Sequence, residues 1–67
     1  MIVLKGHFIS FKEDVIEFSV TKGKKYKIEN VEFININERD YYFKNDKGVL
    51  DYVSTSSSLF HLFEFSE

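Results

Sequence analysis

Apolar and polar residues alternate position by position in three stretches of the chain. In residues 18–21, 25–28 and 34–37, Phe, Val, Tyr or Ile alternate with Ser, Thr, Lys or Asn. A two-residue period places successive side chains on opposite faces of a β-strand, so one face is buried. The chain also lacks Ala and is rich in Phe, Ile, Val and Tyr, which favours strands over helices. We therefore predict an all-β fold.

Turn-forming residues interrupt this pattern at short intervals. We expect turns at residues 22–24, 37–40 and 45–48. The last is a hairpin loop, because Gly48 accepts the positive φ that closes it. The strands predicted between these signals span residues 2–11, 15–20, 25–36, 40–45, 48–53 and 60–65.

Two segments depart from simple strands. Near Asn30 the apolar positions change parity, which predicts a β-bulge within the third strand. Ser54–Phe60 is rich in residues that cap helical turns and predicts one short 3-10 turn. A helix over Lys12–Phe18 is an alternative to the second strand, because the apolar residues there do not strictly alternate.

A chain of 67 residues forms one domain, residues 1–67, around one core. A chain this short buries only about 60% of the surface that its unfolded form exposes, so large side chains must supply the core. Eight Phe and four Tyr do so. Alternation predicts an interior made of Ile9, Phe11, Phe18, Val20, Tyr26, Ile28, Phe33, Phe43, Val49, Leu59 and Leu62.

Composition limits the classes of function. The chain has no Cys, which excludes disulfides and cysteine-bearing zinc sites. A net charge of −2 argues against a duplex nucleic-acid binder. No stretch approaches the roughly 20 apolar residues of a spanning helix, and the opening MIVLKGHF lacks a signal-cleavage site. We expect a cytoplasmic protein without cofactors.

The chain is rich in Lys, Ile, Asn and Phe. This composition is typical of a low-GC bacterium or its phages.

The order of these signals resembles the SH3-like barrel over about residues 16–65. Ile16–Ile28 is similar to the family's diverging turn, Tyr41–Phe43 to its aromatic pair, Asn45–Val53 to its distal hairpin, and Ser54–Phe60 to its single helical turn. The resemblance implies a small barrel of five or six antiparallel strands. SH3 domains that bind proline-rich peptides use a Trp and a Pro, and this chain has neither. That function is therefore not carried over.

The Lys-Gly-Lys turn, the glycine hairpin and the Phe residues near the end of the chain also resemble small proteins of phages that infect Gram-positive bacteria. Such proteins imply a partner in the host cell.

Catalytic and metal chemistry find little support. The only imidazoles, His7 and His61, would have to converge with a carboxylate such as Glu13, Asp51 or Glu64 to bind a metal, and their spacing does not require it. The serines near His61 lack the orienting acid and pocket of a hydrolase. They are more simply a capped, solvated turn, so we predict that the protein is not an enzyme.

Twelve aromatic rings, eight Phe and four Tyr, exceed what so small a core encloses. Exposed aromatic residues gathered in one patch mark a protein-binding site or a homodimer contact. A second core beneath the N-terminal segment is the alternative. We predict a protein-binding surface, suited to a basic partner because acidic residues border the rings. Its residues are Tyr41, Tyr42 and Tyr52 with Asp40 and Asp51.

The alternative surface is basic. Lys22, Lys24, Lys25 and Lys27 surround Tyr26, and together they could provide charge and stacking for single-stranded nucleic acid. Lysines also commonly solvate turns and guard strand edges. Eleven carboxylates oppose the nucleic-acid hypothesis, which we therefore rank second.

Overall fold

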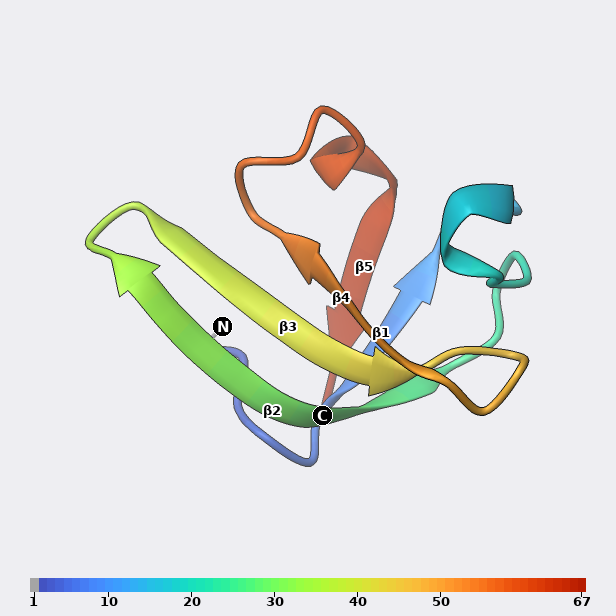
Figure 1. The fold of residues 1–67 in the computed structure, drawn as a ribbon, viewed down its shortest axis with the longest axis horizontal. Helices are drawn as coiled ribbons and strands as arrows, with labels where there is room; N and C mark the ends of the chain where they lie inside the picture. The colour runs from blue at the N-terminus through green and yellow to red at the C-terminus, as the bar shows by residue number, and fades with distance from the viewer. Residues whose placement is uncertain (1) are drawn as a thin grey trace.

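The computed structural model describes residues 2–67 as five antiparallel strands in one sheet, with two 3-10 helices and no α-helix (Figure 1). This confirms the predicted all-β fold. The sheet order is β4-β3-β2-β1-β5. Along the chain the elements are β1 (Phe8–Phe11), η1 (Ile16–Phe18), β2 (Tyr26–Asn35), β3 (Glu38–Lys44), β4 (Leu50–Ser54), η2 (Phe60–Leu62) and β5 (Phe63–Ser66).

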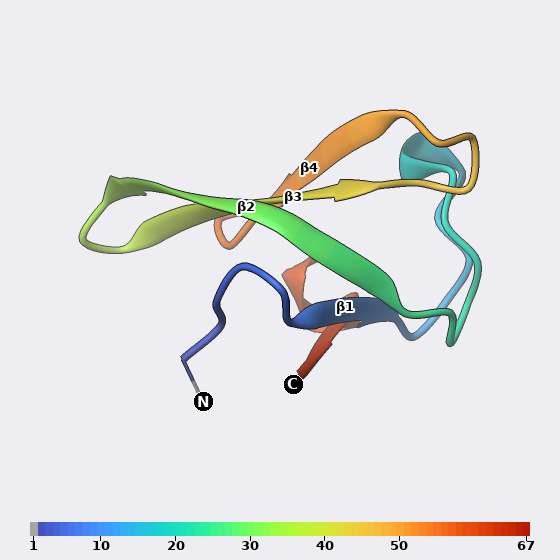
Figure 2. The same ribbon diagram turned by 90° about the horizontal axis from the view of Figure 1, so that it is seen from below.

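The sheet folds over itself into two layers. Figure 2 shows β2, β3 and β4 above β1 and β5, with the core between them. The two end strands of the order, β4 and β5, do not pair within residues 2–67, so the sheet is not closed into a barrel.

The predicted bulge in the long strand is confirmed. Ile28 pairs with Phe43 of β3, but the next pair is Asn30 with Tyr42, so Glu29 is an extra residue on β2. The N-terminal end of β2 pairs with β1, and the rest pairs with β3. The bulge therefore lies where β2 passes from one layer to the other.

The predicted strand at residues 15–20 is wrong. Val15 and Val20 form one isolated bridge, with mutual N–H···O distances of 3.3 Å, and η1 lies inside the loop that they close. Both valines are buried while Ile16 between them is exposed. The alternative of a helix over residues 12–18 is also wrong in extent, because only three residues are helical.

The first strand is shorter than predicted. Gly6 has φ +94° and its N–H donates to the carbonyl of Ile28 at 2.9 Å, so the chain turns before β1 begins at Phe8. The second turn lies at residues 36–37 and not at 37–40, because the amide oxygen of Asn35 accepts the N–H of Asn37 at 2.8 Å and closes a tighter loop.

The third turn and the late helical turn follow the prediction more closely. Gly48 has φ +74°, and the side chain of Asn45 accepts the N–H groups of Lys47 and Val49. Turns and a bend occupy residues 55–59, after β4 ends at Ser54, but the 3-10 helix η2 begins only at Phe60 and replaces the start of the strand predicted at 60–65.

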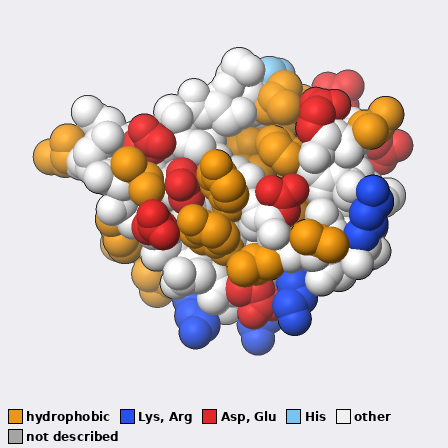
Figure 3. Space-filling view, in the orientation of Figure 1, with side chains coloured by type: hydrophobic (Ala, Val, Ile, Leu, Met, Phe, Trp, Pro, Cys, Tyr) orange, Lys and Arg blue, Asp and Glu red, His pale blue; other side chains and the backbone are white. Residues whose placement is uncertain are grey.

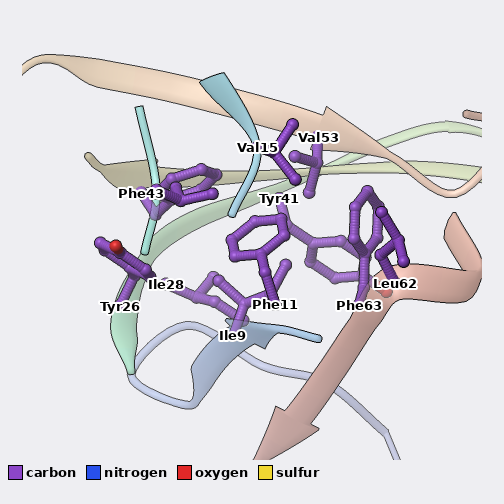
Figure 4. Packing of buried hydrophobic residues seen from close by; sticks show 11 residues of the cluster. Ile9, Phe11, Val15, Tyr26, Ile28, Tyr41, Phe43, Val53, Leu62 and Phe63 are labelled. Atoms are coloured by element: carbon purple, nitrogen blue, oxygen red, sulfur yellow. The ribbon is translucent and has the colours of Figure 1, made fainter. Parts of the chain in front are cut away.

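The core is built around one ring. Figure 4 shows Phe11 between the two layers, and its ring centroid lies 5.3–6.1 Å from the rings of Phe18, Tyr26, Phe43 and Phe63. Seven predicted interior residues are buried, and Phe18 and Leu59 are partly buried against them. The seven are Ile9, Phe11, Val20, Tyr26, Ile28, Phe43 and Leu62.

Phe33 and Val49 were predicted inside but lie outside. Phe33 is 69% exposed because the β2–β3 hairpin extends beyond the lower layer, and Val49 is 56% exposed in the turn before β4. Tyr41 and Phe63 are buried in addition to the predicted residues. Tyr41 packs on Phe65 with a centroid distance of 4.9 Å, so part of the aromatic surplus is absorbed by the inner side of the sheet.

Substitution of Phe11 tests this arrangement. We expect Phe11→Ala to lower the free energy of unfolding by about 3–5 kcal/mol, because it leaves a cavity among four rings. Urea unfolding followed by tyrosine fluorescence measures the change. The exposed Phe33→Ala is the matched control, with a loss of about 1 kcal/mol or less. Equal losses in the two variants would contradict the central role of Phe11.

Candidate protein-binding surface

The outer face of β2, β3 and β4 presents the side chains that alternate with the core. Tyr41 and Phe43 point inward, so Tyr42 and Asp40 point outward from the central strand β3. Strand pairing places two cross-strand rows on this surface, which we call the tyrosine face. The rows are Asn30, Tyr42 and Tyr52, and Glu32, Asp40 and Ser54.

Tyr42 and Tyr52 form the aromatic centre of the tyrosine face. Their ring centroids are 5.4 Å apart with an interplanar angle of 35°, as expected for a directly paired cross-strand couple. Tyr52 is 50% exposed. The Tyr42 hydroxyl donates to Glu32 Oε2 at 3.4 Å. Partial burial, and then the negative charges of Glu32 and Asp40, raise the pKa of Tyr42.

Three carboxylates lie on one side of this pair. Glu32 lies opposite Asp40 on the neighbouring strand, and Glu38 lies two residues before Asp40, so all three share a face. Glu38 Oε2 accepts a hydrogen bond from Ser54 Oγ at 3.3 Å. Asp40 is only 9% exposed, and its Oδ1 is buried without a hydrogen-bond partner.

Within residues 2–67 none of these three carboxylates forms an ion pair. The single ion pair formed within residues 2–67 joins Lys24 to Asp46, neither of which lies on the tyrosine face. Figure 3 looks onto this face and shows hydrophobic and acidic side chains mixed over its centre, with Lys and Arg toward the periphery. The surface is therefore aromatic and electronegative.

The structure brings together only part of the predicted set. Tyr42, Tyr52 and Asp40 share the face as expected, whereas Tyr41 is 3% exposed and belongs to the core. Tyr41 is excluded because adjacent residues of a strand face opposite ways. Asp51 also lies off the row and accepts the backbone N–H of Tyr52 at 2.8 Å.

Glu32 and Glu38 were missed by the sequence analysis. Glu38 has the same parity as Asp40 and Tyr42, so the alternation of β3 was a sufficient signal for it. Glu32 could not be placed without the β2–β3 register, which the bulge at Glu29 shifts.

The predicted basic surface is only partly available. Lys22, Lys24, Lys25 and Lys27 are exposed, but Tyr26 is buried and its ring packs against Phe11 and Phe43. The expectation that Tyr26 offers its ring to a base is wrong, because alternation directs it into the core.

The end of the Tyr26 side chain joins a polar cluster. Its hydroxyl accepts the N–H of Thr21 at 2.7 Å and donates to Asp46 Oδ1 at 2.9 Å. Lys24 Nζ lies 2.8 Å from the same carboxylate oxygen, and Thr21 Oγ1 donates to Asp46 Oδ2 at 2.7 Å. These bonds, that of Lys24 first, hold the pKa of Asp46 at about 2, below its ordinary value of 3.8. Asp46 thus ties the β3–β4 turn to the segment before β2.

The histidines and serines serve local structure. His7 Nδ1 accepts the N–H of Leu4 at 3.1 Å, and His61 Nδ1 lies 3.1 Å from the carbonyl oxygen of Ser58. Ser57 Oγ accepts the N–H of Leu59 at 3.1 Å, as a turn cap does. Within residues 2–67 no three His, Asp or Glu side chains are grouped so that they could hold a metal ion.

No protein-family model, curated protein or solved structure matches the chain. Across residues 2–67 there is no helix of the length and apolarity that crossing a membrane demands.

The Asp46 cluster predicts a pH dependence of stability. A carboxyl whose pKa is lowered in the folded state stabilises the fold above its unfolded pKa, and this contribution is lost as pH falls from about 4 toward 2. We expect Asp46→Asn to lower Tm at pH 6 and to flatten the fall of Tm between pH 4 and 2. Thermal unfolding followed by circular dichroism tests this. Glu64→Gln, an exposed carboxyl on β5, should keep the wild-type slope, and an unchanged slope in Asp46→Asn would contradict the assignment.

Substitution of Asp40, unlike that of Asp46, is expected to stabilise the fold. We expect Asp40→Asn to raise the free energy of unfolding at pH 7 by about 1 kcal/mol, because it replaces a carboxylate whose Oδ1 is buried without a partner, beside two other carboxylates, by a neutral group. Denaturant unfolding measures the change, and Glu64→Gln should stay within about 0.5 kcal/mol of wild type. A destabilised Asp40→Asn would show that the carboxylate is satisfied in the free protein.

Proposed function

We propose that the protein is a non-enzymatic protein-binding module that docks a partner with a basic surface on the tyrosine face. The observation that carries this proposal is the outward Tyr42–Tyr52 pair beside carboxylates that form no ion pair within residues 2–67. Tyrosine is enriched among the residues that dominate binding energy at protein interfaces.

The charge of the face supports a protein rather than a nucleic acid at this site. Glu32, Glu38 and Asp40 would repel phosphates, whereas a basic protein surface would be attracted and oriented by them. The aromatic centre offers the area that is buried on docking, and the acidic groups around it select the partner.

Two finer assignments belong to the same proposal. The order β4-β3-β2-β1-β5, with a 3-10 turn directly before the last strand, supports an SH3-like arrangement. The lysine-rich, alanine-free composition supports an origin in a phage of a Gram-positive bacterium. The partner would then be a cytoplasmic host protein that the domain modulates or inhibits.

Nucleic-acid binding through the lysine segment is the second candidate. Of its four lysines, only Lys24 forms an ion pair within residues 2–67. Lys22 and Lys25 before β2 and Lys27 within it are exposed. Without the ring of Tyr26, these lysines supply charge but not base stacking.

Removal of the two outward tyrosines tests the main proposal. Tyr42→Ser combined with Tyr52→Ser should abolish capture of basic proteins from a bacterial lysate by the immobilised chain, because the aromatic centre is lost. Quantitative mass spectrometry of the captured proteins gives the result. Phe60→Ser changes a comparably exposed ring on η2 and should retain capture.

Thermal unfolding must show that the double variant is folded. If a folded double variant captured the same proteins as wild type, the tyrosine face would not be the binding surface. Sedimentation at several concentrations identifies the case in which the partner is a second copy of the chain.

A titration at two salt concentrations tests the second candidate. Labelled single strands should bind at low salt and weaken steeply as salt rises if the lysines contact phosphates. Lys22→Gln with Lys25→Gln should then reduce affinity, whereas Lys5→Gln, outside the segment, should not. An absence of binding at low salt would remove this candidate.

A further inference from the structure

The Asp40 carboxylate has an unused hydrogen-bond acceptor. It lies on β3 between Glu32 and Ser54, and its Oδ1 is buried without a hydrogen-bond partner among residues 2–67. Buried polar groups are ordinarily paired, since an unpaired one destabilises the fold. A carboxylate kept in this state is prepared for a donor that comes from outside the chain.

The groups around Asp40 define what that donor must be. Two further carboxylates, Glu32 and Glu38, share its face, and the Tyr42–Tyr52 rings form an aromatic surface beside it. The ligand should therefore be cationic, carry several donors and lie flat against an aromatic ring. Within residues 2–67 the acidic side chains are not grouped to hold a metal ion, which favours an organic cation.

We propose that the tyrosine face binds an arginine side chain of the partner, with its guanidinium group on Asp40 and Glu32 and its plane against Tyr42. This inference rests on the protein-binding function proposed above. A guanidinium carries five donors in a planar fork, matches carboxylates two bonds at a time and stacks on aromatic rings. The ammonium group of lysine is compact and strongly hydrated and meets only the charge requirement.

Access to Asp40 requires a small rearrangement. The Tyr42 hydroxyl holds Glu32 only by a long hydrogen bond of 3.4 Å, and Glu32 is exposed. Exposed side chains change rotamer in picoseconds to nanoseconds, so Glu32 can reorient toward a ligand without a change in the sheet. It then becomes the second acceptor for the incoming guanidinium.

The test is an NMR titration of the 15N-labelled full chain at constant ionic strength with three probes. N-acetyl-arginine amide should cause saturable shifts of the Asp40, Tyr42 and Tyr52 amides. N-acetyl-lysine amide should bind roughly tenfold more weakly, since it loses a charge-assisted hydrogen bond. The neutral isostere N-acetyl-citrulline amide should not bind.

Two variants connect the shifts to the proposed groups. Asp40→Asn and Glu32→Gln should each weaken the arginine probe about tenfold, while Glu64→Gln on β5 should leave its affinity unchanged. Equal binding of the lysine probe would overturn the inference. Shifts that survive Asp40→Asn, or no saturable shift at about 50 mM, well above a millimolar dissociation constant, would overturn it too.

The result is separable from that of the proposed function. If the double tyrosine variant loses protein capture but the arginine probe does not bind the wild type, only the guanidinium assignment fails. If capture survives the tyrosine substitutions, the protein-binding face itself is wrong, whatever the probes do.

Discussion

One extra residue, Glu29, separates the pair Ile28–Phe43 from the pair Asn30–Tyr42 in the long β2–β3 ladder. Without it, the two-residue period would carry the inward side chains of β2 onto the wrong face after Ile28, because a slip of one residue inverts a strand. The bulge lets β2 contribute Ile28 to the core next to β1 and still direct Val31 inward under β3. Core packing and the placing of Asn30 opposite Tyr42 and of Glu32 opposite Asp40 therefore depend on the same irregularity.

The sequence predicted this feature because the parity change between Ile28 and Val31 is local. It also predicted most of the core, since residues such as Ile9, Phe11 and Phe43 follow strand alternation. The prediction from the sequence was wrong at positions whose burial or backbone path depends on the packing of distant segments. Phe33 has the inward parity of β2 but lies where the hairpin extends beyond β1 and β5, and the Val15–Val20 loop is shaped by one bridge that no period encodes.

The candidate site was predictable to a similar degree. Tyr42 and Tyr52 follow from strand pairing across the Asn45–Gly48 turn, which glycine and asparagine specify. Tyr41 lies in the core and not on this surface, because adjacent residues of a strand point to opposite faces. The unpaired oxygen of Asp40 has no counterpart in the sequence, since it depends on which side chains of two other strands surround it. The face thus combines a locally encoded aromatic pair with an electrostatic arrangement that only the fold creates.

The bond from the Tyr52 amide to the carboxylate of Asp51 has a consequence for the way in which this domain can associate. β4 is a terminal strand of an open sheet, and such edges are templates for a further strand from another chain. At Tyr52 the backbone N–H already donates to the carboxylate of Asp51. A strand from another chain would have to displace this carboxylate before it could pair with β4 at this position. Main-chain addition, which is tolerant of sequence, is disfavoured here, and recognition is left to side chains, which discriminate between partners.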